Sequence, residues 1–206
     1  MKSYKYDFHC HSTLSDAKLS VEELLVKATE RKLSGLIITD HHGNVGALCS
    51  GIAFASKLTS SKMPVIMGVE LNTSWNEFLV LGSKALEYLV DTSEQSIFDL
   101  VYDQSLSGEL KILKHLDSLG AGIIACHPDP DLLQSFNVYA PFVHGIEALY
   151  GGRENALTGI CHEVARQFKK RIMLSTDNHQ DYVGLRYTET SKKLKTTDDV
   201  AMWLKS

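Results

Sequence analysis

An excess of basic residues is missing from this sequence. Its 206 residues include 21 lysines and arginines against 25 aspartates and glutamates, which gives a net charge of −4 at pH 7. Tight non-specific binding to nucleic acid requires a broad basic face, so that class of function is not expected. A nucleic acid is expected at most as a substrate whose end enters a site.

The sequence also lacks long apolar runs and closely spaced cysteines. No run approaches the roughly 18 apolar residues that a membrane-spanning helix needs, so a membrane partner is not expected. The four cysteines lie far apart, at Cys10, Cys49, Cys126 and Cys161. Since the first residues do not resemble a signal peptide, we expect free thiols in a reducing cytoplasm.

Internal repeats, low-complexity tracts and linkers are absent as well. Apolar residues make up 44% of the chain and charged residues 22%, as in an ordinary globular protein. The length is sufficient for one sizeable hydrophobic core. We therefore expect a single domain over residues 1–206.

Short apolar runs alternate with helical patterns along the chain. The apolar runs predict strands at residues 4–8, 36–39, 65–71, 78–82, 123–126, 145–149 and 172–176. Helices are expected at residues 20–32, 45–58, 96–119, 154–170 and 196–205. Because parallel neighbours need helical crossovers, this alternation indicates an α/β fold with a mostly parallel sheet. The pattern alone leaves an open doubly wound sheet and a closed barrel as alternatives.

Polar side chains follow the C-terminal end of strand after strand. His9 and His11 are two residues apart in an extended segment, so their imidazoles point to the same side and can share one cation. Asp16 lies in a polar loop that can fold back toward them. The further candidates are Asp40, His41, Glu70, His127, Asp177 and His179. Strand ends surround one mouth in a barrel but gather only at a switch point in an open sheet, which favours the barrel.

Five spaced motifs carry a family resemblance. They are His9-x-His11 with Asp16, Thr39-Asp40-His41, Gly68-Val69-Glu70, Cys126-His127-Pro128 and Ser175-x-Asp177-x-His179. Together they resemble the motifs of the PHP (polymerase and histidinol phosphatase) family, in the family's order, from Asp7 to about Tyr187. The resemblance implies a distorted (β/α)7 TIM-like barrel. It also implies a metal cluster at the C-terminal mouth that hydrolyses phosphate esters.

The same resemblance implies the metal ligands, which would also be the catalytic residues. The ligands of a first ion would be His9, His11, Glu70 and Asp177. The ligands of a third ion would be Asp16, His41 and His179. Between these, Glu70 would bridge to a second ion that His127 helps to hold. Two to three divalent ions of Zn, Mn or Fe are expected, since mixed His, Asp and Glu ligation suits them better than calcium.

Two positions depart from the family's pattern. Many members carry a histidine in the strand after the bridging glutamate, where this chain has Leu79, which cannot coordinate a metal. The second site is therefore short of a ligand, and is weak, water-rich or empty. His42 stands where the family more often has Asp, Asn or Gly, and it would bind substrate or metal or cap a helix.

The residues that would bind substrate are less sharply defined. Arg153 and Arg186 are candidates for gripping a phosphate, with an ordinary surface position as the alternative for each. Members often carry an arginine soon after the His-Pro motif, whereas Asp129 and Asp131 stand there in this chain. Glu147 either faces the mouth and hydrogen-bonds a ligand or is simply a polar residue of the interior.

The function expected from these residues is metal-dependent hydrolysis of a phosphate ester by a metal-activated water. The substrate would be a small phosphorylated metabolite or a nucleotide. A binding or regulatory module with a partly eroded metal site is the alternative, motivated by Leu79 and the acidic segment after His127. An exonuclease ranks third because the chain offers no basic surface.

Overall fold

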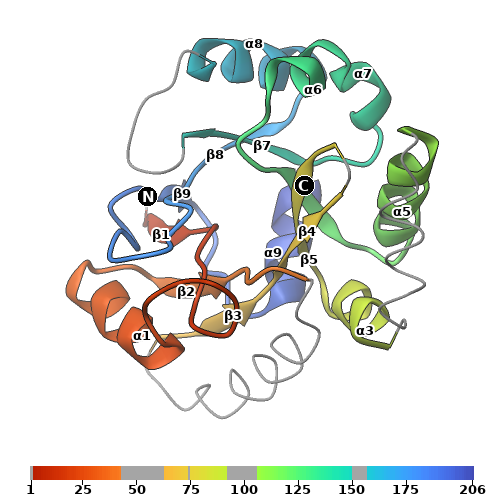
Figure 1. The fold of residues 1–206 in the computed structure, drawn as a ribbon. Coiled ribbons are helices and arrows are strands. Elements are labelled where there is room, and N and C mark those ends of the chain that lie inside the picture. Colours follow the sequence, from red (N-terminus) through yellow and green to blue (C-terminus); the bar gives the residue numbers. More distant parts are fainter. Residues whose placement is uncertain (1, 43–62, 74, 92–105, 150–156) are drawn as a thin grey trace.

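The protein is described by a computed structural model that covers residues 2–42, 63–73, 75–91, 106–149 and 157–206 (Figure 1). The expected helix at 45–58 lies outside these residues. So do the first part of the helix expected at 96–119 and the substrate-binding candidate Arg153.

Nine strands form two sheets within the described residues. The first sheet has the order β3-β2-β1-β9, with β1 at Tyr4–Asp7, β2 at Gly35–Ile38, β3 at Val65–Met67 and β9 at Thr188–Thr190. The second has the order β4-β5-β6-β7-β8, with β4 at Val69–Asn72, β5 at Glu77–Leu81, β6 at Gly122–Ala125, β7 at Gly145–Leu149 and β8 at Arg171–Leu174. The strands expected from the apolar runs are all present, but they do not form one sheet.

Strand directions are mixed. The pairs β1–β2, β2–β3, β6–β7 and β7–β8 are parallel, whereas β5 runs antiparallel to both β4 and β6. A short turn between β4 and β5 explains the reversal, because so few residues can only join antiparallel strands. In that turn the Thr73 N–H donates to the Asn76 carbonyl at 2.8 Å. The N-terminal end of β5 therefore lies beside the C-terminal ends of β4 and β6.

The α/β class is confirmed, whereas the closed seven-unit barrel is not. Within the part of the chain that the structure describes, two isolated bridges join the sheets, Cys10 with Asn178 and His41 with Glu70, and no continuous ladder closes a ring. Where the backbone ladder stops, polar side chains hydrogen-bond the backbone groups instead. Asp7, for example, accepts a hydrogen bond from the Thr176 N–H at 3.0 Å. Such side-chain acceptors replace the backbone partners that a continuous ladder would need.

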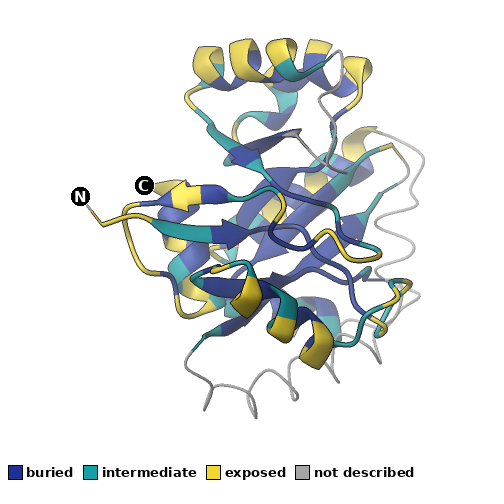
Figure 2. Ribbon diagram, turned by 90° about the vertical axis from the view of Figure 1, so that its left-hand side faces the viewer, coloured by how far each residue is buried: buried dark blue, intermediate teal, exposed yellow. Residues whose placement is uncertain are grey.

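Six of the seven described helices cover the outer faces of the sheets (Figures 1 and 2). They are α1 (Val21–Glu30), α3 (Ser83–Asp91), α5 (Leu106–Ser118), α6 (Pro130–Gln134), α7 (Phe136–Tyr139) and α8 (Thr158–Phe168). The seventh, α9 (Thr197–Lys205), packs against β5 and β6 with its apolar residues toward the interior. Helix α1 begins at a capping box in which Ser20 and Glu23 accept from each other's backbone N–H groups at 3.3 and 2.8 Å. Within the described ranges, no helix has the length and apolar character needed to cross a bilayer.

Successive strand residues point to opposite faces and so build two apolar clusters. One cluster packs between the strands and their covering helices and includes Leu36, Val80 and Ile123. The other lies on the inner side and includes Leu79 and Ile124, both fully buried, with residues of α9. Apolar side chains therefore fill the interior directly beneath the candidate polar residues.

Candidate metal centre

His9, His11, Glu70 and Asp177 converge from the segments that follow β1 and β8 and from the first half of β4. The Nε2 atoms of His9 and His11 lie 3.1 Å apart. Those two atoms lie 3.1 and 3.2 Å from the Glu70 carboxylate oxygens, and 3.5 and 3.4 Å from Asp177 Oδ1. The two histidines and Glu70 are buried. The structure thus brings together the four side chains expected around a first ion.

These separations fit donors that share one cation. With bonds of about 2.1 Å, adjacent donors around an octahedral or tetrahedral ion lie about 3.0–3.4 Å apart. Glu70 Oε1 and His11 Nδ1 are also buried without a hydrogen-bond partner among the described residues. A buried carboxylate oxygen in that state is costly unless a cation or donor reaches it.

His127 extends the cluster toward a second position. Its Nε2 lies 3.4 Å from Glu70 Oε1, and His9, Glu70 and His127 offer ligand atoms within 4.8 Å of one another. The backbone of His127 has a φ of 21°, in a region that non-glycine residues rarely adopt. Its N–H donates to Glu147 Oε2 at 2.8 Å, which stabilises this conformation.

A third group opens toward solvent. Asp16 Oδ2 lies 3.5 Å from His41 Nε2 and 3.3 Å from His179 Nε2. His11 Nδ1 faces the other oxygen of Asp16 at 3.8 Å, and so joins a group in which the sequence had placed only the other three residues. The side chain of Asp16 is 52% exposed, so this is the open side of the cluster.

Glu147 hydrogen-bonds His9 on the side of the ring that faces away from Glu70. Its Oε1 lies 3.2 Å from His9 Nδ1 and accepts from Ser175 Oγ at 2.5 Å. Glu147 is buried, as an interior polar residue would be, and it also hydrogen-bonds the candidate ligand His9, as the first of the two alternatives expects. Because Glu147 contacts Nδ1, it turns the Nε2 atom of His9 toward Glu70 and Asp177.

Two further acids fix the loops that carry the site. Asp40 accepts from the Ser12 N–H and Ser12 Oγ, both at 2.7 Å, and from Ser15 Oγ at 2.5 Å. It thereby shapes the loop that brings Asp16 into place. Asp7, which sequence reasoning missed, accepts from Gly184 N–H at 2.7 Å as well as from Thr176. Its only sequence signal was its position at a strand end beside the first motif.

The charges of the cluster are strongly coupled. Burial raises the pKa of Glu70, but the surrounding histidines outweigh burial and the net shift of this pKa is downward. Burial lowers the pKa of His9, yet Glu147 and Glu70 bring it well above its ordinary value. A hydrogen bond to Glu70 raises the pKa of His41 to about 9, and one to Asp177 does the same for His179. The arrangement therefore favours positive charge at its centre.

Of the three expected substrate-binding residues, the structure describes His42 and Arg186. His42 is buried, and its Nδ1 accepts from the Asn72 N–H at 3.2 Å, so it supports the end of β4. Burial lowers the pKa of His42, in keeping with a neutral acceptor. Arg186 is half-buried two residues before β9, and its role in binding a phosphate stays a prediction.

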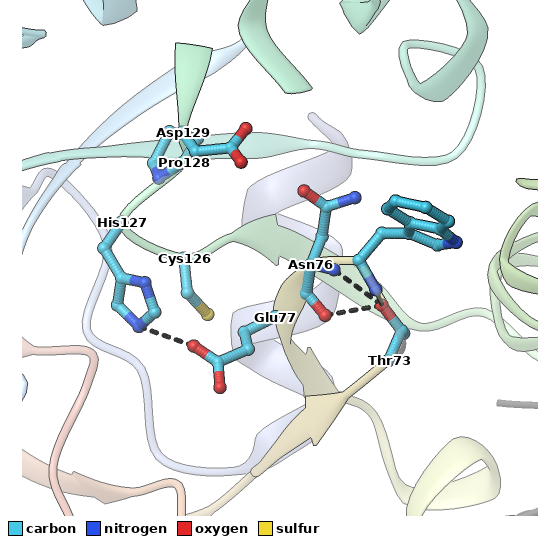
Figure 3. Close-up of a pocket in the computed structure, with 8 residues that line it drawn as sticks. Thr73, Asn76, Glu77, Cys126, His127, Pro128 and Asp129 are labelled. Carbon is cyan, nitrogen blue, oxygen red and sulfur yellow. Dashed lines mark hydrogen bonds and ion pairs between the residues drawn. The ribbon is translucent and has the colours of Figure 1, made fainter. Parts of the chain in front are cut away.

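A cavity of about 220 Å³ opens beside His127 (Figure 3). Its lining residues are Thr73, Trp75, Asn76, Glu77, Cys126, His127, Pro128 and Asp129. Figure 3 shows Glu77 and His127 facing each other, with Glu77 Oε2 at 3.1 Å from His127 Nε2. Sequence reasoning missed Glu77, although it lies two residues from Leu79 and therefore on the same face of β5.

Comparison with known proteins agrees with this geometry. The model of the PHP domain family matches residues 7–182. A 5'-3' exoribonuclease from Haemophilus influenzae is 38% identical over 71 residues, which are 34% of this chain and only 24% of that protein. The chain thus aligns with about a quarter of that relative's length.

Solved structures show the same fold at low sequence identity. PsfC from Pseudomonas syringae is 17% identical with a TM-score of 0.74, covering 98% of this chain and 88% of that one. An amidohydrolase from Chromobacterium violaceum is 16% identical with a TM-score of 0.65, covering 97% and 96%. A Bifidobacterium adolescentis protein, named as a proposed metal-dependent phosphoesterase, is 13% identical with a TM-score of 0.60, covering 96% and 94%. These likenesses concern the fold alone.

Proposed function

This chain belongs to the PHP domain family, and from that membership we propose that it is a metal-dependent hydrolase of phosphate esters. The observation that carries the proposal is the convergence on Glu70. Four histidines, His9, His11, His41 and His127, approach its carboxylate at 3.0–3.4 Å from the segments that follow three different strands. A carboxylate surrounded in this way is suited to bridging cations.

The residues present fit two to three divalent ions of the Zn, Mn or Fe type. The first would be held by His9, His11, Glu70 and Asp177, the second by Glu70 and His127, and the third by Asp16, His41 and His179. Ions bound there would neutralise the phosphate and lower the pKa of water to roughly 7. The same eight residues are the catalytic set that we propose.

The protein's own contribution is orientation and exclusion of water. Glu147 holds the His9 ring, and Asp40 holds the loop that carries Asp16. Leu79 and Ile124 close the site from below with fully buried apolar side chains. Charged groups interact more strongly in such surroundings than in water. A substrate would approach from the exposed side, where Asp16 lies.

The cavity beside His127 bears on the leaving group. Two carboxylates, Glu77 and Asp129, line it, and lysine and arginine are absent from its lining among the described residues. Carboxylates repel a second anionic group. We therefore favour a monoester whose leaving group is uncharged, from a small metabolite or a nucleoside. An exonuclease is not favoured, because the chain carries a net charge of −4 and a polyanion needs cationic contacts.

We also propose a cytoplasmic location. Cys10, Cys126 and Cys161 are buried free thiols, and two of them adjoin the metal cluster. Free thiols persist in a reducing compartment.

Phosphate release tests the proposed function. The metal-loaded protein is assayed against a broad panel of phosphate monoesters, with His9→Ala and Asp177→Asn as site variants and exposed His162→Ala as a matched control. We expect turnover that chelation abolishes and that both site variants reduce by at least about a hundredfold, with the control unchanged. A fully metal-loaded protein that hydrolyses no ester in the panel would contradict the proposal.

A further inference from the structure

Leu79 leaves a gap in the second metal position. It pairs with Glu70 across the β4–β5 hairpin and is fully buried in the inner apolar cluster. Its side chain therefore lies level with the bridging carboxylate and offers no donor atom. Glu70 and His127 alone supply two protein ligands, which is few for a tightly held ion.

Glu77 lies on the same strand face, two residues nearer the mouth. It pairs with Asn72 at the end of β4, and its carbonyl accepts from the Cys126 N–H at 3.0 Å. This places Glu77 beside His127, the residue that follows. Because β5 is antiparallel to both neighbours, its first residue reaches the level at which β4 and β6 end.

The nitrogen that Glu77 faces decides its role. Glu77 Oε2 lies 3.1 Å from His127 Nε2, and Glu70 Oε1 lies 3.4 Å from that same nitrogen. Glu147, by contrast, contacts Nδ1 of its partner His9, on the far side from Glu70. A residue that only orients a ligand histidine binds the nitrogen turned away from the metal. Glu77 stands instead on the donor side.

The other carboxylate oxygen of Glu77 is already held. Asn72 Nδ2 donates to Glu77 Oε1, while Asn72 Oδ1 lies 3.0 Å from His41 Nδ1. The Glu77 side chain is 33% exposed, so an ion can reach Oε2 from the cavity. Glu70 Oε1, buried and without a hydrogen-bond partner among the described residues, faces the same space.

We propose that Glu77 is the third protein ligand of the second metal site, in place of the missing histidine at position 79. This rests on the proposed function only in taking a metal cluster around Glu70 as its premise. Two carboxylates and one imidazole form an oxygen-rich set, which suits Mn²⁺ better than an imidazole-rich set does. The site is therefore specified for a Mn²⁺-type ion rather than eroded.

Direct metal titration tests the assignment without an activity assay. Metal-free full-length protein is titrated with Mn²⁺, and free Mn²⁺ is followed by electron paramagnetic resonance. Glu77→Gln keeps the hydrogen-bond acceptor for Asn72 but removes the negative charge. Glu77→His supplies an imidazole nitrogen that can bind a metal. Asp129→Asn is the matched control, because it changes a carboxylate of the same cavity and asparagine still caps α6.

We expect Glu77→Gln to weaken one class of Mn²⁺ site by at least about tenfold and to leave the others as in the wild type. Glu77→His should retain that site with a preference shifted toward Zn²⁺, and Asp129→Asn should match the wild type. Unchanged Mn²⁺ binding in Glu77→Gln, with loss of a site in His127→Ala, would overturn the assignment. If the Glu77 variants behave as expected but the loaded wild type hydrolyses no ester, the proposed function fails and the assignment stands.

Discussion

Glu70 is the residue around which the charges of this protein are arranged. One of its oxygens faces His9 and His127, and the other faces His11 and His41. A single side chain thus contacts donors of all three candidate metal groups. The physical reason is position, because β4 lies at the junction of the two sheets, where strand ends from both sides meet.

Glu147 offers a test at the scale of one residue. In Glu147→Gln the amide can still accept one hydrogen bond, but it loses the charge beside His9 Nδ1. We expect metal affinity at the first site to fall by about 10- to 100-fold, since the His9 ring is no longer held in one orientation. Isothermal titration with Mn²⁺ measures this change. A variant in which kcat falls while all metal affinities persist would contradict the positioning role.

The candidate metal ligands could largely be predicted from the sequence, whereas the residues that contact and position them could not. The eight candidate ligands stand in motifs whose spacing marks them, and the structure places them in one cluster. Glu77 and Asp7 are single acids at strand ends, and nothing in a sequence distinguishes such an acid from a solvated one. Their roles depend on which backbone groups and rings a distant strand brings to them.

At the scale of elements, the loop from Ser12 to Asp16 depends on Asp40. Asp40→Asn would place an amide donor where Ser12 and Ser15 now donate. We expect the loop to lose its fixed shape, and Mn²⁺ affinity at the group containing Asp16 to fall by about tenfold or more. The first site should be unaffected. Paramagnetic line broadening of the histidine resonances would distinguish the two sites, and equal weakening of both would contradict this account.

A second element-scale prediction concerns His144, at the start of β7. Its Nδ1 accepts a hydrogen bond from the Ile123 N–H of β6 at 3.2 Å, so this nitrogen must carry no proton and the imidazole must be neutral. Burial, together with the nearby charge of Lys205, lowers the pKa of His144 to about 4, although Asp117 acts in the opposite direction. The unfolded value is about 6.5. Between these values the unfolded chain binds more protons than the folded one, so stability falls as pH decreases.

We therefore expect the free energy of unfolding to fall by at most about 3 kcal/mol from this group between pH 6.5 and 4. His144→Asn keeps an acceptor for Ile123 and cannot titrate, so its stability curve should be flatter over that interval. Urea unfolding of both proteins in excess chelator measures the difference. Parallel curves for the two proteins would show that His144 does not cause the pH dependence.

The periodicity of the sequence could not predict that β5 runs antiparallel to its neighbours. The apolar run predicted the strand but not its direction. An alternating or continuous apolar pattern does not encode direction. The short turn at residues 73–76 sets it, and that turn also brings Glu77 to the mouth.

At the scale of the whole molecule, the alternation of apolar runs with helical patterns predicts the α/β class. It does not predict whether the sheet closes into a barrel. A closed barrel requires hydrogen bonding at every junction. Here the two junctions are made by isolated bridges and by side chains such as Asp7. The same segments carry the donor atoms of the site, so an ion bound there would link the two sheets.

Metal removal should therefore destabilise the whole fold. Ions that bind only the folded chain add about 2.7 kcal/mol of stability at a hundred times their Kd. For a chain of this length that corresponds to a rise of about 5–10 °C in Tm. Calorimetry with chelator and then with added Mn²⁺ measures the shift, and Glu70→Gln serves as a comparison that should show little of it. An unchanged Tm would contradict coupling between the site and the fold.

Anomalous diffraction from metal-loaded crystals tests the central claim most directly. Data collected on either side of the Mn absorption edge locate bound ions independently of any assay. The account predicts ions at about 2.0–2.2 Å from the Glu70 carboxylate and from the Nε2 atoms of His9 and His11. Loaded crystals with no anomalous peak within about 3 Å of Glu70 would contradict it.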